Sequence, residues 1–351
     1  MWGDVVYELT TSMTTERPAV GPGVAPGTME TVITRTNYAR STTSVEITTE
    51  RFDSASKMVF ETVEEEGIAI QNGAAISFTE NGTPIFAGFV FTAKRSMDKK
   101  VEYTAYDQTY YLKAKASYTF VDMTLEAIIT QIAQDFNLVV GELASTGYKF
   151  PSLVEENTEC LGIIYKALSQ VIIQTGKIFV FYDDFGKLTL KEVKDMMVTS
   201  LIGNRSLMTD YTYTRDMASD TYNRVKLVRP NKETGKADTY VYEDTDTQKK
   251  WGLLQYYESV DENLNAAQIE EMCKKYLAYY NRLVQTVDID ALGITGLRAG
   301  NIIPVRIAGI EDLTGNRLLL AEKVTHKYEG EAHTMSIDVK NFEQLGGASW
   351  I

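Results

Sequence analysis

The chain has 351 residues, of which 44% are hydrophobic and 24% charged, and its formal net charge at pH 7 is -13. This apolar content can build the cores of two or three domains of about 100 to 200 residues each, which excludes a disordered protein. The acidic balance argues against a surface that binds nucleic acid by neutralising its phosphates.

Targeting and redox signals are sparse. The N-terminus lacks the basic stretch and apolar run of a signal peptide, and no uncharged apolar run reaches the roughly 18 residues that span a bilayer. We therefore expect synthesis in the cytoplasm, without a signal peptide and without membrane contact. The two cysteines, Cys160 and Cys273, lie in helix-like apolar patterns, where cysteine is usually a small buried hydrophobe. Neither a disulfide framework nor a zinc site is indicated.

The first hundred residues favour β-structure. Val5–Thr10, Thr31–Thr36 and Thr42–Thr49 are rich in β-branched residues and predict strands. Between the first two, Arg17–Gly27 holds three prolines and three glycines, which predicts an arm or loop without regular structure. Two interpretations stay open for this arm: a flexible surface loop, or a segment that becomes ordered against a neighbouring subunit.

A β-meander is predicted next, from Gly73–Phe78, Ile85–Val90 and Val101–Asp107. Asn81-Gly82 lies between the first two strands and readily takes the positive φ angles of a tight hairpin. In the third strand Val101, Tyr103 and Ala105 alternate with polar residues, so this strand should have one buried face.

Residues 119–197 predict a compact α+β module. Apolar residues spaced three and four apart from Leu125 to Phe136 indicate a helix that Asp122 or Thr124 can cap. A second helix should begin near Thr158 and stop at Gly176, and Lys177–Val193 should form a hairpin.

Strand patterns then return at Leu201–Tyr213, Tyr222–Val228 and Asp238–Thr247, with an exposed hairpin tip at Arg229–Lys236. A third helix is predicted over 265–284. It begins at Asn265, which can form a capping box with Gln268.

The succession of strands and turns in the first meander recurs near the C-terminus. Gly300–Val305, Leu318–Val324 and His333–Val339 are separated by turn-forming residues, as in the first copy. We interpret this as one small β-unit present at both ends of the chain.

Candidate catalytic groups are few. His326 and His333 lie on consecutive predicted strands and could meet across a hairpin, but three or four convergent ligands would be needed for a metal site, so a structural role is the simpler interpretation. Asp183 and Asp184 precede Phe-Gly in a tight turn, where aspartates commonly bond their own backbone.

Two acidic clusters could attract Ca²⁺. These are Glu64–Gly67 and the group Glu243, Asp244 and Asp246, yet neither has the glycine and distal glutamate of an EF-hand loop. A solvated face explains both. We therefore predict no catalytic, cofactor-binding or metal-binding residue, and no enzyme activity.

Tyrosine is abundant, with 21 residues. Clusters occur at Tyr103–Tyr111, Tyr256–Tyr257 and Tyr276–Tyr280. Tyrosine suits interfaces because one end is apolar and the other forms hydrogen bonds, but packing within a barrel wall explains the clusters equally well.

The ordered succession of short motifs resembles the XkdQ/YqbQ-type proteins of phage-like contractile tails, which belong with the baseplate hub proteins. The motifs extend over nearly the whole chain, and each is weak alone. They are Phe86–Val90, Tyr103–Asp107, Tyr111–Leu112, Thr124–Ala133, Thr175–Val180, Gly186–Leu190, Asn223–Val225, Trp251–Gln255, Leu297–Gly300, Val324–His326 and His333–Met335.

The resemblance implies an α+β, mainly β fold, with two similar β-barrel-like modules flanking an α+β module in a trimeric hub. We expect a first β-module at 1–118, the α+β module at 119–197, a second β-module at 198–345 and a tail at 346–351. The implied partners are two further copies of the chain, the tail tube or its initiator, the central spike, wedge proteins and the end of a tape-measure protein.

The expected role is therefore a structural hub of a phage tail or phage-tail-like bacteriocin, adapting a sixfold tube to a threefold spike. Two other functions compete with it. A tail-associated cell-wall hydrolase would need two carboxylates about 5 to 9.5 Å apart in a cleft. A receptor- or glycan-binding tail module would use the tyrosines.

Overall fold

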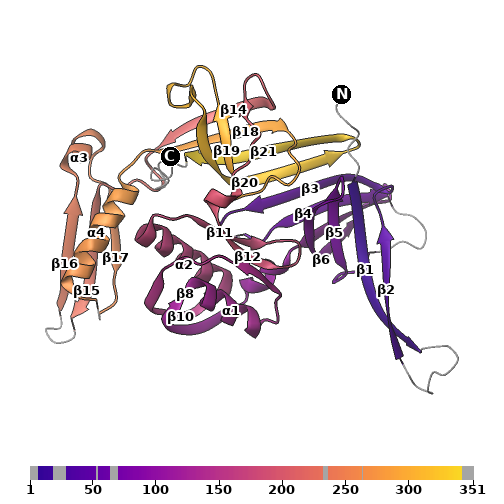
Figure 1. The fold of residues 1–351 in the computed structure, drawn as a ribbon, viewed down its shortest axis with the longest axis horizontal. Helices are drawn as coiled ribbons and strands as arrows, with labels where there is room; N and C mark the ends of the chain where they lie inside the picture. The colour runs from indigo at the N-terminus through magenta and orange to yellow at the C-terminus, as the bar shows by residue number, and fades with distance from the viewer. Residues whose placement is uncertain are drawn as a thin grey trace.

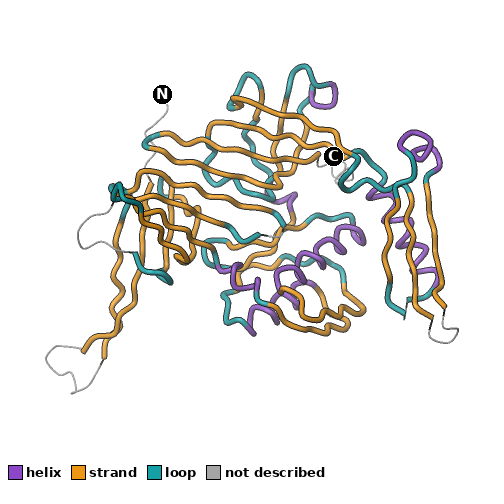
Figure 2. Tube along the Cα trace, turned by 180° about the vertical axis from the view of Figure 1, so that it is seen from behind, coloured by secondary structure: helices purple, strands orange, loops and turns teal. Residues whose placement is uncertain are grey.

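The structure is a computed structural model that describes residues 7–18, 29–52, 54–63, 70–231, 236–262 and 264–341. Strands dominate these residues and helices are few, which confirms the predicted α+β, mainly β fold. Thirteen strands form one large sheet, accompanied by two sheets of three strands and one of two (Figures 1 and 2).

Seven strands build the N-terminal part of the large sheet. They are β1 (Tyr7–Pro18), β2 (Met29–Asn37), β3 (Thr42–Glu50), β4 (Lys57–Val63), β5 (Ala75–Glu80), β6 (Thr83–Arg95) and β7 (Lys100–Tyr106). The predicted meander is β5–β6–β7, and Asn81 and Gly82 take φ angles of 49° and 77° in its first turn. The predicted face of β7, formed by Val101, Tyr103 and Ala105, is buried.

The first hairpin corrects one expectation. Arg17 and Pro18 were expected to lack regular structure, but they lie in β1 and pair with Glu30 and Met29 of β2. Beyond Ser12, β1 pairs with β2 alone. Pro18 has no backbone N–H group, but at this position no second neighbouring strand would have accepted a hydrogen bond from it. The rest of the predicted arm, residues 19–27, lies outside the described residues. The paired strands extend away from the body of the molecule (Figure 1).

Six strands build the C-terminal part of the large sheet. They are β13 (Ile202–Gly203), β14 (Met208–Asp216), β18 (Val284–Leu292), β19 (Ile302–Arg306), β20 (Arg317–Glu329) and β21 (Ala332–Asn341). The second predicted meander is β19–β20–β21. The structure thus has an antiparallel meander near each end of the chain, as the sequence predicts.

The two parts are joined by one strand pair, β3 with β20. It is antiparallel and runs from Lys323 opposite Glu50 to Glu329 opposite Ser44. Tyr328 of β20 is fully buried in the core of the N-terminal part, where its ring lies 4.8 Å from that of Phe78. Because Val324 of the same strand lies in the core of the C-terminal part, β20 contributes to both cores.

The middle of the chain forms an α+β unit beneath this sheet (Figure 1). Its elements are β8 (Lys115–Thr124), α1 (Leu125–Asp135), β9 (Val140–Leu143), β10 (Lys149–Glu159), α2 (Cys160–Thr175), β11 (Phe179–Asp183) and β12 (Leu188–Glu192). Thr124 caps α1, Gly176 ends α2 with φ at 71°, and β11 and β12 form the predicted hairpin. The pairing of β8 with β10 was not predicted.

A lobe stands beside the body and consists of β15 (Arg224–Asn231), β16 (Lys236–Glu243), α3 (Thr245–Trp251), β17 (Gln255–Ser259) and α4 (Ala266–Tyr280) (Figure 2). The predicted capping box of Asn265 and Gln268 is present at the start of α4.

Three predicted boundaries in this region are wrong. The hairpin tip expected over 229–236 is shorter, because β15 extends to Asn231 and β16 begins at Lys236. The strand expected over 238–247 stops at Glu243, because Asp244 accepts hydrogen bonds from backbone N–H groups and starts α3. The helix expected over 265–284 stops at Tyr280, and β18 begins at Val284. The domain limits at 118/119 and 197/198 stay predictions.

A substitution of Gly88 in β6 tests the packing of the N-terminal part. A Cβ atom at this position would lie 2.2 Å from the Tyr106 carbonyl oxygen. We expect Gly88→Ala to lower the free energy of unfolding by about 1–3 kcal/mol, measured by urea denaturation. Gly162→Ala is the matched control, because its Cβ would approach no heavy atom closer than 4.0 Å and alanine favours the helix by about 0.5–1 kcal/mol. Equal effects of the two substitutions would contradict this packing.

Candidate functional site

Arg298 lies where three parts of the fold meet. It belongs to the loop between β18 and β19, and its guanidinium stacks on the Tyr182 ring of β11, with Cζ 3.6 Å from the ring centroid. Nη1 donates to the carbonyl oxygen of Asp183 over 3.2 Å. Burial lowers the pKa of Arg298 from its usual value, while the negative charges around it act in the opposite direction. The loop thus inserts a cation between the C-terminal strands and the α+β unit.

Two buried carboxylates, Asp107 and Asp183, lie near this cation. Asp107 accepts from the backbone N–H groups of Thr109, at 3.0 Å, and Ser56, at 3.2 Å. Asp183 accepts from Gln108 Nε2 and from the Gly186 N–H, both over 2.7 Å. Burial raises the pKa of both carboxyls, and the Asp107 charge helps to raise that of Asp183 to about 6. The N-terminal part, the α+β unit and the Arg298 loop are therefore linked through one buried polar cluster.

The Arg298 loop also bonds to its neighbours through other residues. The Ala299 N–H donates to Thr49 Oγ1 of β3 over 3.0 Å. The Asn301 side chain donates to the Met196 carbonyl over 2.7 Å and accepts from the Arg298 N–H, also over 2.7 Å. The motif Leu297–Gly300 is thus a connector between the parts of the fold.

A second buried chain of hydrogen bonds crosses the β3–β20 joint. His326 Nε2 lies 2.6 Å from the Leu297 carbonyl oxygen, and His326 Nδ1 lies 2.8 Å from His333 Nε2. His333 Nδ1 in turn lies 2.8 Å from Glu80 Oε1, while the Tyr328 hydroxyl donates to Glu80 Oε2 over 3.1 Å. The chain ties the end of β5 to β20 and β21.

The partners at its two ends determine where the protons lie. The Leu297 carbonyl can only accept, so His326 Nε2 carries a hydrogen. Burial lowers the pKa of His326 to about 4, so at neutral pH its Nδ1 is an acceptor and His333 Nε2 donates to it. Burial alone would raise the pKa of Glu80, but the hydrogen bond and charge of His333, together with hydrogen bonds from Thr295 and Tyr328, lower it overall. The Glu80 carboxylate accepts from His333 Nδ1, so His333 lies between this carboxylate and the Nδ1 atom of His326.

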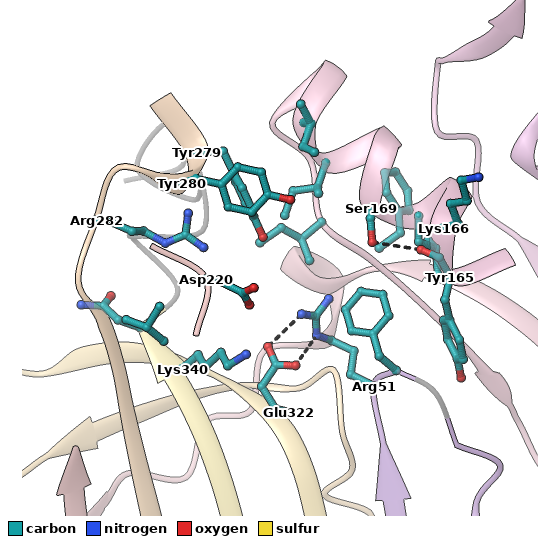
Figure 3. A pocket seen from close by; sticks show the side chains of 18 of the residues that line it. Arg51, Tyr165, Lys166, Ser169, Asp220, Tyr279, Tyr280, Arg282, Glu322 and Lys340 are labelled. Carbon is teal, nitrogen blue, oxygen red and sulfur yellow. Dashed lines mark hydrogen bonds and ion pairs between the residues drawn. The ribbon is translucent and has the colours of Figure 1, made fainter. Parts of the chain in front are cut away.

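A cleft of about 460 Å³ lies between α2, the end of α4 and the edge of the large sheet (Figure 3). Arg51, just after β3, and Glu322 of β20 form a bidentate ion pair along its wall, with distances of 3.0 and 2.8 Å. Asp220, Arg282 and Lys340 extend toward the same space (Figure 3).

The structure brings the two predicted histidines together, but with a carboxylate and a carbonyl as further partners. Within the described ranges, no three His, Cys, Asp or Glu side chains gather as metal ligands would. Asp183 bonds the backbone of its own turn as predicted, and Cys160 and Cys273 are buried. In the described part of the chain, no helix is both long enough and apolar enough to cross a membrane.

The acidic clusters have ordinary surroundings where the structure describes them. Asp244 caps α3, and Asp246 forms an exposed ion pair with Lys249. Glu64–Gly67 and the tail at 346–351 lie outside the described residues.

The tyrosines mostly pack against other aromatic rings of the same chain. Tyr103 stacks on Phe60, and Tyr106 stacks on Tyr110, with ring centroids 5.0 and 4.5 Å apart. Tyr257, by contrast, is 58% exposed on the lobe. Internal packing therefore explains most of the clusters.

Sequence reasoning missed the carboxylate that bonds His333 and the buried polar cluster around Arg298. Glu80 had no predicted role, Asp107 was predicted only as the end of a meander strand and part of a family motif, and Arg298 only as part of a family motif. The available signal was Leu297–Gly300 itself, a motif with an arginine between apolar residues in a β-rich region.

Comparisons with known proteins agree on one group. A family model described as YQBQ-like matches residues 45–340. The phage-like element PBSX protein XkdQ of Bacillus subtilis (strain 168) is 32% identical over 275 residues, which cover 77% of this chain and 82% of XkdQ.

Solved structures share the fold at low sequence identity. The 43 kDa tail protein of prophage MuSo2 from Shewanella oneidensis has a TM-score of 0.66 at 13% identity, covering 96% of this chain and 99% of that chain. A type VI secretion component from E. coli, described as structurally similar to the T4 bacteriophage tail proteins gp27 and gp5, has a TM-score of 0.51 at 10% identity, covering 85% and 73%.

The Arg298 cluster can be tested by removing its cation. We expect Arg298→Met to lower the free energy of unfolding at pH 8 by about 3–5 kcal/mol, because two buried carboxylates lose their counter-charge. The loss should be smaller at pH 5, below the folded-state pKa of about 6 for Asp183, because protonation removes the charge of this acid. Arg306→Met, at an exposed position of β19, should change stability by less than about 0.5 kcal/mol. An Arg298 effect that does not vary with pH would contradict the proposed charge balance.

The His326 chain predicts a pH dependence. Because the folded-state pKa of His326, about 4, lies below its usual 6.5, the unfolded state takes up the proton first as pH falls. The contribution to stability is complete above pH 6.5 and declines toward pH 4, by up to about 3 kcal/mol. We expect the stability difference between wild type and His326→Asn to shrink over that range in denaturation curves. Other groups, Asp183 among them, titrate in both proteins, so their effects cancel in the difference. A stability difference that stays constant with pH would therefore refute the assignment.

Proposed function

We propose that this chain, which belongs to the YQBQ-like family, is the structural baseplate hub of a contractile injection system, either a phage tail or a phage-tail-like bacteriocin. The coarser assignment, a phage tail or baseplate-type protein, follows from its relatives. In the proposed role, three copies form a ring between a hexameric tail tube and a trimeric central spike. The localisation that goes with this role is the baseplate of the particle.

The observation that carries the proposal is the β3–β20 pair. It holds two antiparallel meanders, β5–β6–β7 and β19–β20–β21, in one continuous sheet at a fixed relative orientation. A closed ring repeats one interface around its axis. Three chains with two similar meanders each would therefore offer six similar units to a sixfold tube and remain a trimer toward the spike.

The structural likeness to the E. coli secretion component supports the same role. That protein is described as similar to two T4 tail proteins, gp27 and gp5. For this chain, the proposed partners are the tube or its initiator above, the spike below, wedge proteins around it and the end of a tape-measure protein.

A hydrolase finds little support in the site. The buried pair of acids, Asp107 and Asp183, accepts hydrogen bonds from backbone N–H groups and from an amide side chain, and both residues are almost fully inaccessible. A glycosidase needs its two carboxyls in a cleft that substrate enters. We therefore propose a role carried by interfaces and without catalysis.

The proposal predicts a stable trimer. Native mass spectrometry of the purified full chain should give a species of three times the 39.4 kDa chain mass, alone or with tube and spike proteins added. Negative-stain images down the ring axis should show six similar densities. An obligate interface of more than about 2,000 Å² should keep the trimer intact on dilution. A monomer at high concentration with these partners present would overturn the proposal.

A further inference from the structure

The cleft in Figure 3 has cations from four separate segments of the chain and carboxylates from two others. Its lining includes the side chains of Arg51, Lys166, Arg282 and Lys340, against two carboxylates, Asp220 and Glu322. A local excess of positive charge is unexpected in a chain whose formal charge is -13. The cleft therefore differs in sign from the protein as a whole.

Two of these cations are already paired within the chain. Arg51 is held by the bidentate contact with Glu322, and Lys166 forms an ion pair with Glu155 on β10. Their charges are locally balanced. The excess therefore comes from Arg282 and Lys340.

Arg282 is held in place without an anion. Its guanidinium lies over the Tyr279 ring, with Cζ 4.1 Å from the ring centroid, and its Nη1 is buried with no hydrogen-bond partner in the described part of the chain. Lys340 likewise makes no ion pair with any described residue. Two carboxylates line the cleft: Glu322, which already pairs with Arg51, and the exposed Asp220 (Figure 3). A buried charged donor without a partner is costly, so a carboxylate brought to Arg282 would satisfy it.

The cleft also has an apolar part, which we call its floor. It includes Leu168, Ile172, Ile173, Ile178 and Val284, and the polar residues Ser169, Gln285 and Asn341 line the cleft as well. The volume of the cleft, about 460 Å³, falls in the range of sites that hold ligands. A ligand that fills it should carry negative charge on one side and apolar groups on the other.

We propose that this cleft binds an acidic segment of a second protein, in which carboxylates pair with Arg282 and Lys340 and an apolar side chain packs on the floor. A nucleic acid fits less well, because the apolar floor offers no partner to a phosphate backbone and the protein as a whole repels it. The inference goes beyond the hub proposal, and its test by peptide binding is independent of the test for a trimer.

Fluorescence polarisation with a labelled peptide tests the site. The probe has six glutamates followed by one leucine, and the comparison peptide has glutamines in place of the glutamates. The full-length protein should bind the acidic probe and not the neutral one, and added salt should weaken binding. The double variant Arg282→Gln with Lys340→Gln should bind at least about tenfold more weakly. Asp220→Asn should bind more tightly, because it removes the competing carboxylate.

The control pair is Lys94→Gln with Lys249→Gln, which removes the same charge at side chains 77% and 75% exposed and outside the cleft. It should bind the probe as wild type does. Equal losses in both double variants, or equal binding of a six-nucleotide single-stranded DNA, would overturn the proposal. So would absence of binding combined with an altered oligomeric state of the Arg282/Lys340 variant, because a second copy of this chain would then be the occupant. If the probe binds but no trimer forms, the hub proposal is refuted and the binding proposal is not.

Discussion

The structure depends on a single strand that belongs to two cores. β20 packs Val324 among the C-terminal strands and Tyr328 among the N-terminal ones, and its backbone pairs with β3. The core of the N-terminal part is therefore completed by a residue of the C-terminal part. The burial of one large aromatic side chain contributes about 1.5–3 kcal/mol, so the joint is energetically substantial as well as geometrically defined.

Buried polar groups add specificity to this joint. Replacing such ion pairs by apolar residues often leaves stability unchanged, because removing charges from water is costly. Their geometry is more demanding than apolar packing: His333 needs Glu80 on one side and His326 on the other, and Arg298 needs Tyr182 in reach. We infer that these clusters select one arrangement of the N-terminal part, the C-terminal part and the α+β unit. The cleft beside them depends on the same arrangement.

Local signals predicted the elements well. Asn81-Gly82 specified a hairpin, Gly176 a helix end, and Asn265 with Gln268 a capping box, because each acts within a few residues. The joint itself was not predictable, since Arg51 and Glu322 meet across 271 residues of sequence. Pro18 was misassigned for a related reason: a proline is compatible with a strand only when the partner on one side is missing, and the sequence does not state which strands are neighbours. The histidine pair was anticipated, but its carboxylate was not.

The orientation of the β3–β20 pair has a mechanical consequence. The paired residues run from Lys323 opposite Glu50 to Glu329 opposite Ser44. The hydrogen bonds between the strands lie across the strand direction, so a force directed along the strands acts on all of them at the same time. A force directed across the strands would open the bonds one after another from an end. The two meanders should thus resist sliding past each other far better than peeling apart. The direction of an applied force, more than its size, should therefore decide whether the β3–β20 pair stays hydrogen-bonded.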